Sequence, residues 1–191
     1  MRDDEHMATP GTYRVSDNRA VEFDDALYEW AKSARLLLIE VASTYNSHIT
    51  YGVLAEQVQA ETGIRTRSLI THWIGSVLGL VAEVCGTKGE PLLTSLCTQK
   101  SGAMGMGYGI GVTYARGGNP PDNPDAHAAA ERLACYREFA SDMPSDGGAE
   151  RILGITRVKA PRAPKPAPPQ RPICPRCFLQ TPASGRCDQC D

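Results

Sequence analysis

Hydrophobic residues between positions 48 and 112 recur at spacings that predict two consecutive helices. Leu54 and Val58 stand four residues apart, one turn of the first helix. Gly63 ends this helix, because glycine takes the left-handed cap conformation without steric cost. A second helix follows, with Ser68 as its candidate N-cap. Its apolar positions, which fall near a 3.6-residue period, are Ile70, Ile74, Val77, Leu78, Val81 and Val84.

The pattern changes after this second helix and predicts a two-stranded hairpin. Gly86 and Gly89 end the helix, and Pro91 blocks any continuation, since proline cannot continue a helix. Residues 91–99 form the first expected strand, and a turn at 100–102 leads to residues 104–112, where glycine alternates with larger side chains. Close approach of the backbone to a neighbouring element, or to a ligand, explains these glycines at least as well. Two helices followed by a hairpin predict a winged helix-turn-helix, so the expected fold class is mainly α with a small β-hairpin.

Two further helices are expected on either side of this segment. The first begins at Asp24 and ends near residue 46, with Trp30 as a core residue on its apolar stripe. The second runs from residue 124 to 140, with His127 as a surface residue in its first turn. Residues 1–20 contain few apolar side chains and are expected to be disordered. The winged-helix domain therefore spans residues 21–158.

Residues 159–172 separate this domain from the C-terminus. Six of these fourteen residues are proline, which favours an extended polyproline II spacer with a reach of up to about 40 Å. We expect the linker to end at a small, separate unit formed by residues 173–191.

Four cysteines in the last unit have the spacing of a metal site. Cys174 and Cys177 form one C-x2-C pair, and Cys187 and Cys190 form a second pair after nine intervening residues. Two such pairs provide four thiolates for a tetrahedral zinc ion, which predicts a minimal zinc ribbon with four cysteine ligands. A unit this small lacks a hydrophobic core, so metal binding must supply its folding free energy, about 10–16 kcal/mol in comparable modules. A redox dithiol pair and an iron cluster are the alternatives.

Charge is divided unevenly along the chain, although the total is only −2. Residues 1–30 contain eight acidic residues and three arginines, whereas residues 151–187 contain eight basic residues and no acidic residue. This asymmetry favours contact between the C-terminal part and a polyanion, a solvated basic linker being the alternative. The basic residues expected in the contact are Lys159, Arg162, Lys165 and Arg171.

The N-terminal residues are acidic and lack the apolar core of a signal peptide, and no apolar run approaches the roughly 20 residues of a membrane span. We therefore expect a cytoplasmic protein without a membrane partner. The abundance of alanine, glycine, arginine and proline is typical of a bacterium with high GC content or its phage.

The central segment resembles the DNA-binding domain of alkylguanine-DNA alkyltransferases and alkyltransferase-like proteins. Residues 50–55, Thr-Tyr-Gly-Val-Leu-Ala, are similar to the entry into that family's first helix, and residues 72–77 stand where its recognition helix lies. Pro91 and the glycine-rich residues 105–109 are similar to the segments that follow. The family's nucleophile follows its proline directly as P-C-H-R, but Leu92 occupies that place here, so alkyl transfer is not expected. Repair chemistry at Cys85 or Cys97 is a remote alternative.

The resemblance implies a surface that binds double-stranded DNA without reacting with it. Tyr51 would lie near a backbone phosphate, and Arg65, Arg67, His72 and Trp73 would face a groove. Lys88 and Lys100 are expected at the loop and at the tip of the wing. The alternative is that Tyr51 and Trp73 belong to the core and that the arginines are solvated.

These observations predict a non-enzymatic nucleic-acid-binding protein with one structural zinc ion and no small-molecule substrate. The alternative function is that of a protein-protein adaptor, because winged helices and zinc ribbons also bind proteins. The winged-helix domain, called the body below, also carries little positive charge.

Overall fold

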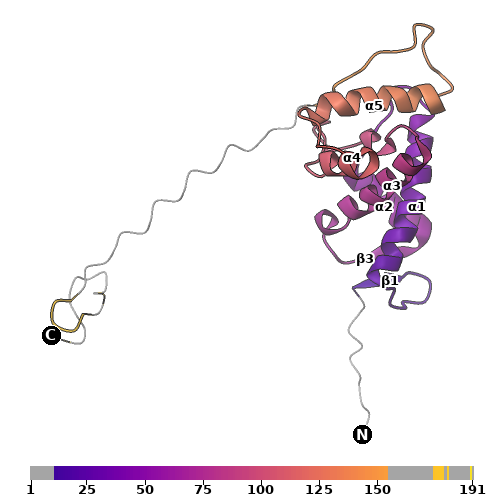
Figure 1. Ribbon diagram of the computed structural model, residues 1–191. Helices are drawn as coiled ribbons and strands as arrows, with labels where there is room; N and C mark the ends of the chain where they lie inside the picture. The colour runs from indigo at the N-terminus through magenta and orange to yellow at the C-terminus, as the bar shows by residue number, and fades with distance from the viewer. Residues whose placement is uncertain (1–10, 155–173, 179, 181–189, 191) are drawn as a thin grey trace. The chain divides into compact units, whose positions relative to one another are not determined.

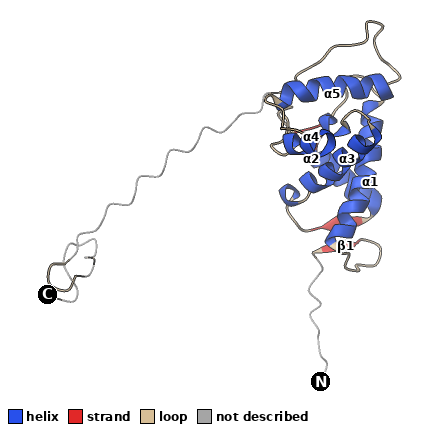
Figure 2. Cartoon of the chain, in the orientation of Figure 1, coloured by secondary structure: helices blue, strands red, loops and turns tan. Residues whose placement is uncertain are grey.

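The computed structural model describes residues 11–154, 174–178, 180 and 190, and it is mainly helical, as expected (Figures 1 and 2). The chain divides into two units, Met1–Thr156 and Arg157–Asp191. Five α-helices of the first unit are described: α1 (Phe23–Ala42), α2 (Tyr51–Thr62), α3 (Ile74–Lys88), α4 (Tyr108–Arg116) and α5 (Pro124–Phe139). Two short 3-10 helices, Ile70–His72 and Leu93–Leu96, and four short strands connect them.

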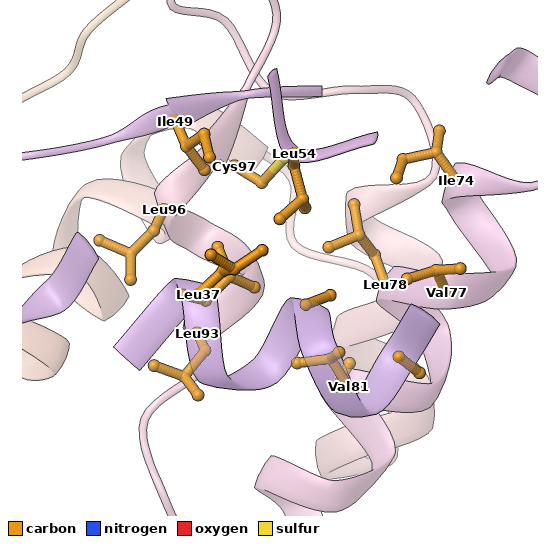
Figure 3. Close-up of a cluster of buried hydrophobic side chains, with 14 of the residues drawn as sticks. Leu37, Ile49, Leu54, Ile74, Val77, Leu78, Val81, Leu93, Leu96 and Cys97 are labelled. Atoms are coloured by element: carbon orange, nitrogen blue, oxygen red, sulfur yellow. The ribbon is translucent and has the colours of Figure 1, made fainter. Parts of the chain in front are cut away.

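One hydrophobic core joins these helices. Trp30 on α1 is fully buried, as predicted; its indole N–H donates to the carbonyl oxygen of Ile64 at 3.0 Å, and its ring lies 4.5 Å from that of Trp73. Figure 3 shows another part of the core, in which Leu37, Leu54, Val81 and Leu93 belong to one cluster. Because these residues come from α1, α2, α3 and the second 3-10 helix, their burial fixes four segments relative to one another.

Helix α3 packs against both α1 and α4, and glycines allow α4 to approach it closely. A Cβ atom at Gly86 would overlap the backbone of Ala115, and one at Gly111 would lie 3.7 Å from the Cβ of Ala82. The backbones of α3 and α4 can therefore approach more closely than larger side chains would allow. Helix α3 continues past Gly86, which was expected to help end it, and ends at Gly89, whose positive φ of 67° makes it a left-handed cap.

Two small sheets replace the predicted arrangement of strands. β1 (Thr12–Arg14) pairs in antiparallel register with β3 (Ile64–Thr66), and β2 (Ile49–Thr50) pairs in parallel with β4 (Cys97–Thr98). The predicted disorder is therefore wrong for the described residues 11–20, while residues 1–10 lie outside the described part. The N–H of Val15 donates to the Gly63 carbonyl, so backbone hydrogen bonds rather than apolar side chains order this segment.

The predicted hairpin is wrong, because its expected second strand forms helix α4 instead. Tyr108 and Val112 point into the core four residues apart, and the intervening glycines fit α4 into the space beside α3 and against Pro120. The alternation of glycine with larger residues therefore reflects close approach of the α4 backbone to a neighbouring element, the alternative explanation of these glycines. Without this hairpin there is no wing at residues 91–112.

The helix-turn-helix is not confirmed either. Helices α2 and α3 follow each other as expected, but residues 63–73 separate them and contain β3 and a 3-10 helix instead of a tight turn. Ser68 does not cap α3, whose N-cap residue is Trp73. The buried ring of Trp73 holds the start of α3 against α1, so the helix begins later than the sequence pattern predicted.

Helix α5 matches its predicted range to within one residue. The side chain of Asn123 caps it by accepting from the N–H of Ala126, and Pro124 occupies its first turn. Arg132, on the buried side of α5, donates to the carbonyls of Ser95 and Arg151 at 2.9 and 3.0 Å. None of the described helices has the length and apolar composition needed to cross a membrane.

Candidate metal centre and nucleic-acid surface

Three of the four predicted metal ligands lie together. The sulfur atoms of Cys174, Cys177 and Cys190 all lie within 4.8 Å of one another, so both C-x2-C pairs contribute to the cluster, as expected. Cys187 falls outside the described residues. The backbone N–H of Arg176 points at the Cys174 sulfur at 3.5 Å, and the N–H of Phe178 donates to the Cys174 carbonyl at 2.9 Å. These two contacts turn the chain back on itself between the cysteines.

The arrangement fits a metal ion. Thiolates that bind one tetrahedral ion at about 2.3 Å place their sulfurs roughly 3.8 Å apart, which the observed cluster meets within about 1 Å. An N–H directed at a sulfur stabilises the thiolate form that metals require. Cys174 is buried and Cys177 and Cys190 are half-buried, so the cluster is partly shielded from water.

Trp73 is wrongly predicted as a nucleic-acid contact. Its side chain is only 1% exposed and packs against Trp30. No groove of DNA can reach a ring in this position. The alternative considered for Trp73, a core residue, is the correct one.

Arg65 and Arg67 lie on and just after β3, where each has a partner within the body. Arg65 makes an exposed ion pair of 3.0 Å with Glu56. The guanidinium of Arg67 lies 5.9 Å from the ring centre of Tyr13, at cation-π distance. An exposed ion pair contributes little stability, so Arg65 is available to an anion at small cost. Arg67 is itself exposed and is available as well.

Lys88 and Lys100 do not extend this surface in the way the sequence predicted. Lys88 lies at the C-terminal end of α3, about 22 Å along the helix from its start, and is 3.9 Å from Glu90. Lys100 is exposed in the turn after β4 but, without a hairpin, is not on a wing. The predicted cations of the body therefore come from three separate segments, which are β3 with the residue after it, the C-terminal end of α3 and the turn after β4.

Tyr51 and His72 line an open groove that sequence reasoning missed. The groove has a volume of about 1340 Å³ and is lined by α1, α3, α4, the first 3-10 helix and the loop before α4, together with Tyr51 of α2, Thr94 and Gln99. The Tyr51 hydroxyl accepts the N–H of Gly105 at 3.0 Å, and burial, with a smaller contribution from Cys97, raises its pKa to about 12. His72 is exposed at the groove edge. Ile110 and Tyr114 could have indicated this groove, because they stand four residues apart in the sequence and would share one face of a helix.

His127 is not simply a surface residue. It is half-buried, and its Nδ1 lies 3.0 Å from the hydroxyl of Tyr108, another residue of the groove. Burial, followed by the charge of Glu131, raises the pKa of Tyr108 above its usual range. The pair connects α4 with α5, and Tyr108 stays neutral at physiological pH.

The three cysteines of the first unit are buried in the core, as predicted for Cys97. Burial raises the pKa of Cys85 and Cys97 and raises that of Cys135 to about 12. A thiol with a raised pKa carries almost no thiolate at neutral pH and is a poor nucleophile. None of the three has the setting that alkyl transfer requires.

The predicted contacts Lys159, Arg162, Lys165 and Arg171 fall outside the described residues. The sequence nevertheless shows that the two parts of the chain carry opposite net charges. Residues 11–154 contain twelve lysines and arginines against seventeen acidic residues, a net charge of −5. Residues 155–191 contain seven against two, a net charge of +5.

Comparisons with protein-family models, with curated proteins and with solved structures found no match to this chain.

Proposed function

We propose that the protein is a non-enzymatic nucleic-acid-binding protein whose C-terminal segment contacts double-stranded DNA and whose four C-terminal cysteines hold one structural zinc ion. The observation that carries the proposal is the division of charge. A net charge of +5 over residues 155–191 attracts a polyanion, whereas a net charge of −5 over residues 11–154 repels it.

The role given to helix α3 by the sequence pattern is not part of this proposal. Its exposed residues before Lys88 include Gly75, Ser76 and Glu83, none of which is basic. A helix that reads DNA needs cations to approach the phosphates and polar side chains to reach the bases. Arg65 and Arg67 remain as the body's candidate phosphate contacts, secondary to the C-terminal segment.

Zinc is the ion that best suits the cysteines. A site built only from thiolates selects soft metals, and two C-x2-C pairs are typical of structural zinc. Four cysteine ligands leave no open coordination position, so the ion would hold the C-terminal residues together rather than activate a substrate. The buried, neutral thiols of the first unit are consistent with a protein that performs no covalent chemistry.

The test compares two sets of substitutions in the full, zinc-loaded chain, using the fluorescence anisotropy of a labelled duplex of about 30 base pairs. Replacement of Lys159, Arg162, Lys165 and Arg171 by glutamine removes four expected phosphate contacts. It should weaken binding strongly at low salt and reduce the slope of log affinity against log salt by about 3 to 4. The matched variant, Arg65→Gln with Arg67→Gln, should change affinity far less.

Three outcomes would contradict the proposal. The body variant could lose as much affinity as the C-terminal variant, the wild-type affinity could be insensitive to salt, or the protein could fail to bind duplex DNA at low salt. The first outcome would return the function to the body, in agreement with the resemblance to alkyltransferase-like domains.

A further inference from the structure

We propose that the groove between α1, α3 and α4 binds an amphipathic helix of a partner protein, one that carries lysine or arginine beside its apolar face. This surface is separate from the C-terminal nucleic-acid contact and does not depend on it. The proposal rests on the size of the groove, its exposed apolar side chains, its bare backbone and its charge.

The groove exposes hydrophobic side chains that the fold does not use. Met106 is 93% exposed and Ile110 is 55% exposed, and the rings of Tyr28 and Tyr114 are also largely accessible. Single exposed apolar residues are ordinary, but several around one groove mark an interaction surface. Methionine and tyrosine are well suited to such a surface, because methionine adapts its shape and tyrosine combines an apolar ring with a hydroxyl.

The backbone of α3 is uncovered along the groove. Gly75 and Gly79 stand one turn apart among the lining residues, and a Cβ atom added at either would meet nothing within 4 Å. A glycine in a helix interior, as Gly79 is, costs about 1 kcal/mol relative to alanine, and packing within the described residues requires neither Gly75 nor Gly79. Gly86, in contrast, is required by the close approach of Ala115. The bare backbone at Gly75 and Gly79 would allow a partner helix to approach closely.

The charge of the groove selects the partner. Its charged lining residues are Asp24 on α1 and Glu83 on α3, and among the described residues that line it there is no lysine or arginine. Asp24 and Glu83 form no ion pair with another described residue. A nucleic acid would be repelled here, whereas a helix with flanking cations would complement both carboxylates.

The dimensions suit a short helix. The lining along α3 extends from Ile74 to Glu83, about 14 Å, which corresponds to two to three helical turns. The volume of about 1340 Å³ exceeds the usual 300–1,000 Å³ of a small-molecule pocket. A helix in such a groove inserts side chains at positions i, i+3 or i+4, and i+7.

The test uses a phage-displayed library of random peptides of about 16 residues, panned against the full, zinc-loaded protein in the presence of nuclease. Enriched peptides should share apolar residues at helical spacing together with lysine or arginine. Ile110→Asp and Met106→Asp should each lower the affinity for a selected synthetic peptide at least tenfold. Val53→Asp is the matched control, because Val53 is a 49% exposed helical residue outside the groove, and it should change affinity less than twofold.

A charge exchange then tests specificity. Glu83→Lys should weaken the same peptide about tenfold, and replacing the peptide's basic residue by glutamate should restore binding to this variant but not to the wild type. Thermal melting of each variant should match the wild type, since all four substituted side chains are exposed.

Four results would overturn the proposal. The first two are that no peptide is enriched, and that Ile110→Asp leaves the affinity for the selected peptide unchanged. The third is that Ile110→Asp lowers the affinity for duplex DNA, and the fourth is a concentration-dependent dimer in ultracentrifugation that Ile110→Asp abolishes. The third would assign the groove to nucleic acid, and the fourth would assign it to a second copy of the chain. Failure of the duplex-binding experiment on the C-terminal segment would leave this proposal intact, because the two tests alter different residues.

Discussion

The six described cysteines fall into two groups that differ in what surrounds their sulfur atoms. Cys85, Cys97 and Cys135 are fully buried among apolar residues of the body, and burial raises the pKa of each thiol. Cys174, Cys177 and Cys190 place their sulfurs within 4.8 Å of one another. The first group behaves as small hydrophobic residues, and the second has the arrangement of metal ligands. Environment, rather than residue type, therefore decides what each cysteine contributes to stability.

The largest expected difference between the groups is in metal binding. Cys174→Ser should reduce the bound zinc from one ion per chain to less than about a tenth, since the metal supplies on the order of 10–16 kcal/mol to a unit of this size. Cys97→Ala should retain the full amount, because Cys97 lies in the body. Mass spectrometric metal analysis after dialysis measures both. Retention of metal by Cys174→Ser, or its loss from Cys97→Ala, would mean that the two groups are not separate.

The second comparison concerns adjacent residues at the start of α3. Trp73→Ala should destabilise the body by about 3–5 kcal/mol, because it removes a buried ring that packs against Trp30. His72→Ala changes an exposed neighbour and should shift the free energy of unfolding by less than about 0.5 kcal/mol. Urea unfolding followed by circular dichroism measures the difference, and the zinc content should be unchanged in both.

This pair also separates the core from a nucleic-acid contact. A folded Trp73→Ala variant of normal stability that binds duplex DNA weakly would restore the original sequence prediction. A loss of stability without a specific effect on DNA would confirm the core assignment.

The helical periodicity predicted most of the fold, whereas contacts between distant residues accounted for the errors. Helices α2 and α5 follow from local patterns, with Gly63 at the end of α2 and Pro124 at the start of α5. Strand β1 could not be predicted, because its order depends on backbone hydrogen bonds to β3, which lies far along the chain. The glycines before and within α4 were misinterpreted because an alternating pattern does not indicate which element lies against them.

The candidate site was predictable to different extents in the two units. The spacing of the cysteines predicts their convergence, since two C-x2-C pairs have few ways to bind one ion. The groove involves Asp24, Glu83 and Ile110 on three different helices, and no local pattern brings them together. Trp73 shows the same limit, because an aromatic residue beside His72 has no local feature that distinguishes a core ring from a DNA contact.

The third comparison uses two glycines on the same helix. Gly86→Ala should destabilise the body by about 1–3 kcal/mol, since the added methyl group would overlap the backbone of Ala115. Gly79→Ala should stabilise it by about 0.5–1 kcal/mol, because the methyl enters open space and alanine favours the interior of a helix. Chemical unfolding at neutral pH measures both. Equal effects would imply that α3 and α4 are not as closely packed as described.

The smallest expected effect is the change in the body's stability over a single pH unit that comes from the thiol of Cys135. The folded body holds the Cys135 proton more tightly than the unfolded chain does, because burial raises its pKa from 9.0 to about 12. The contribution of this thiol to stability is therefore complete below pH 9 and is lost as the pH rises toward 12. The loss is about 1.4 kcal/mol per pH unit. Tyr51 and Tyr136, whose pKa values burial raises from 10.0 to about 12, add to it above pH 10.

Cys135→Ala isolates this contribution, because it removes one titrating thiol and leaves the tyrosines. Its free energy of unfolding should fall less steeply than that of the wild type between about pH 9 and 10, by about 1 kcal/mol over that unit, because the thiol of the unfolded chain is already half ionised at pH 9. The cysteines of the proposed metal site should respond in the opposite direction, since protons compete with a bound ion for thiolates and acid would release it. Parallel slopes for the wild type and the variant would show that Cys135 ionises as readily in the folded body as in the unfolded chain, and the distinction between the two groups of cysteines would then rest on geometry alone.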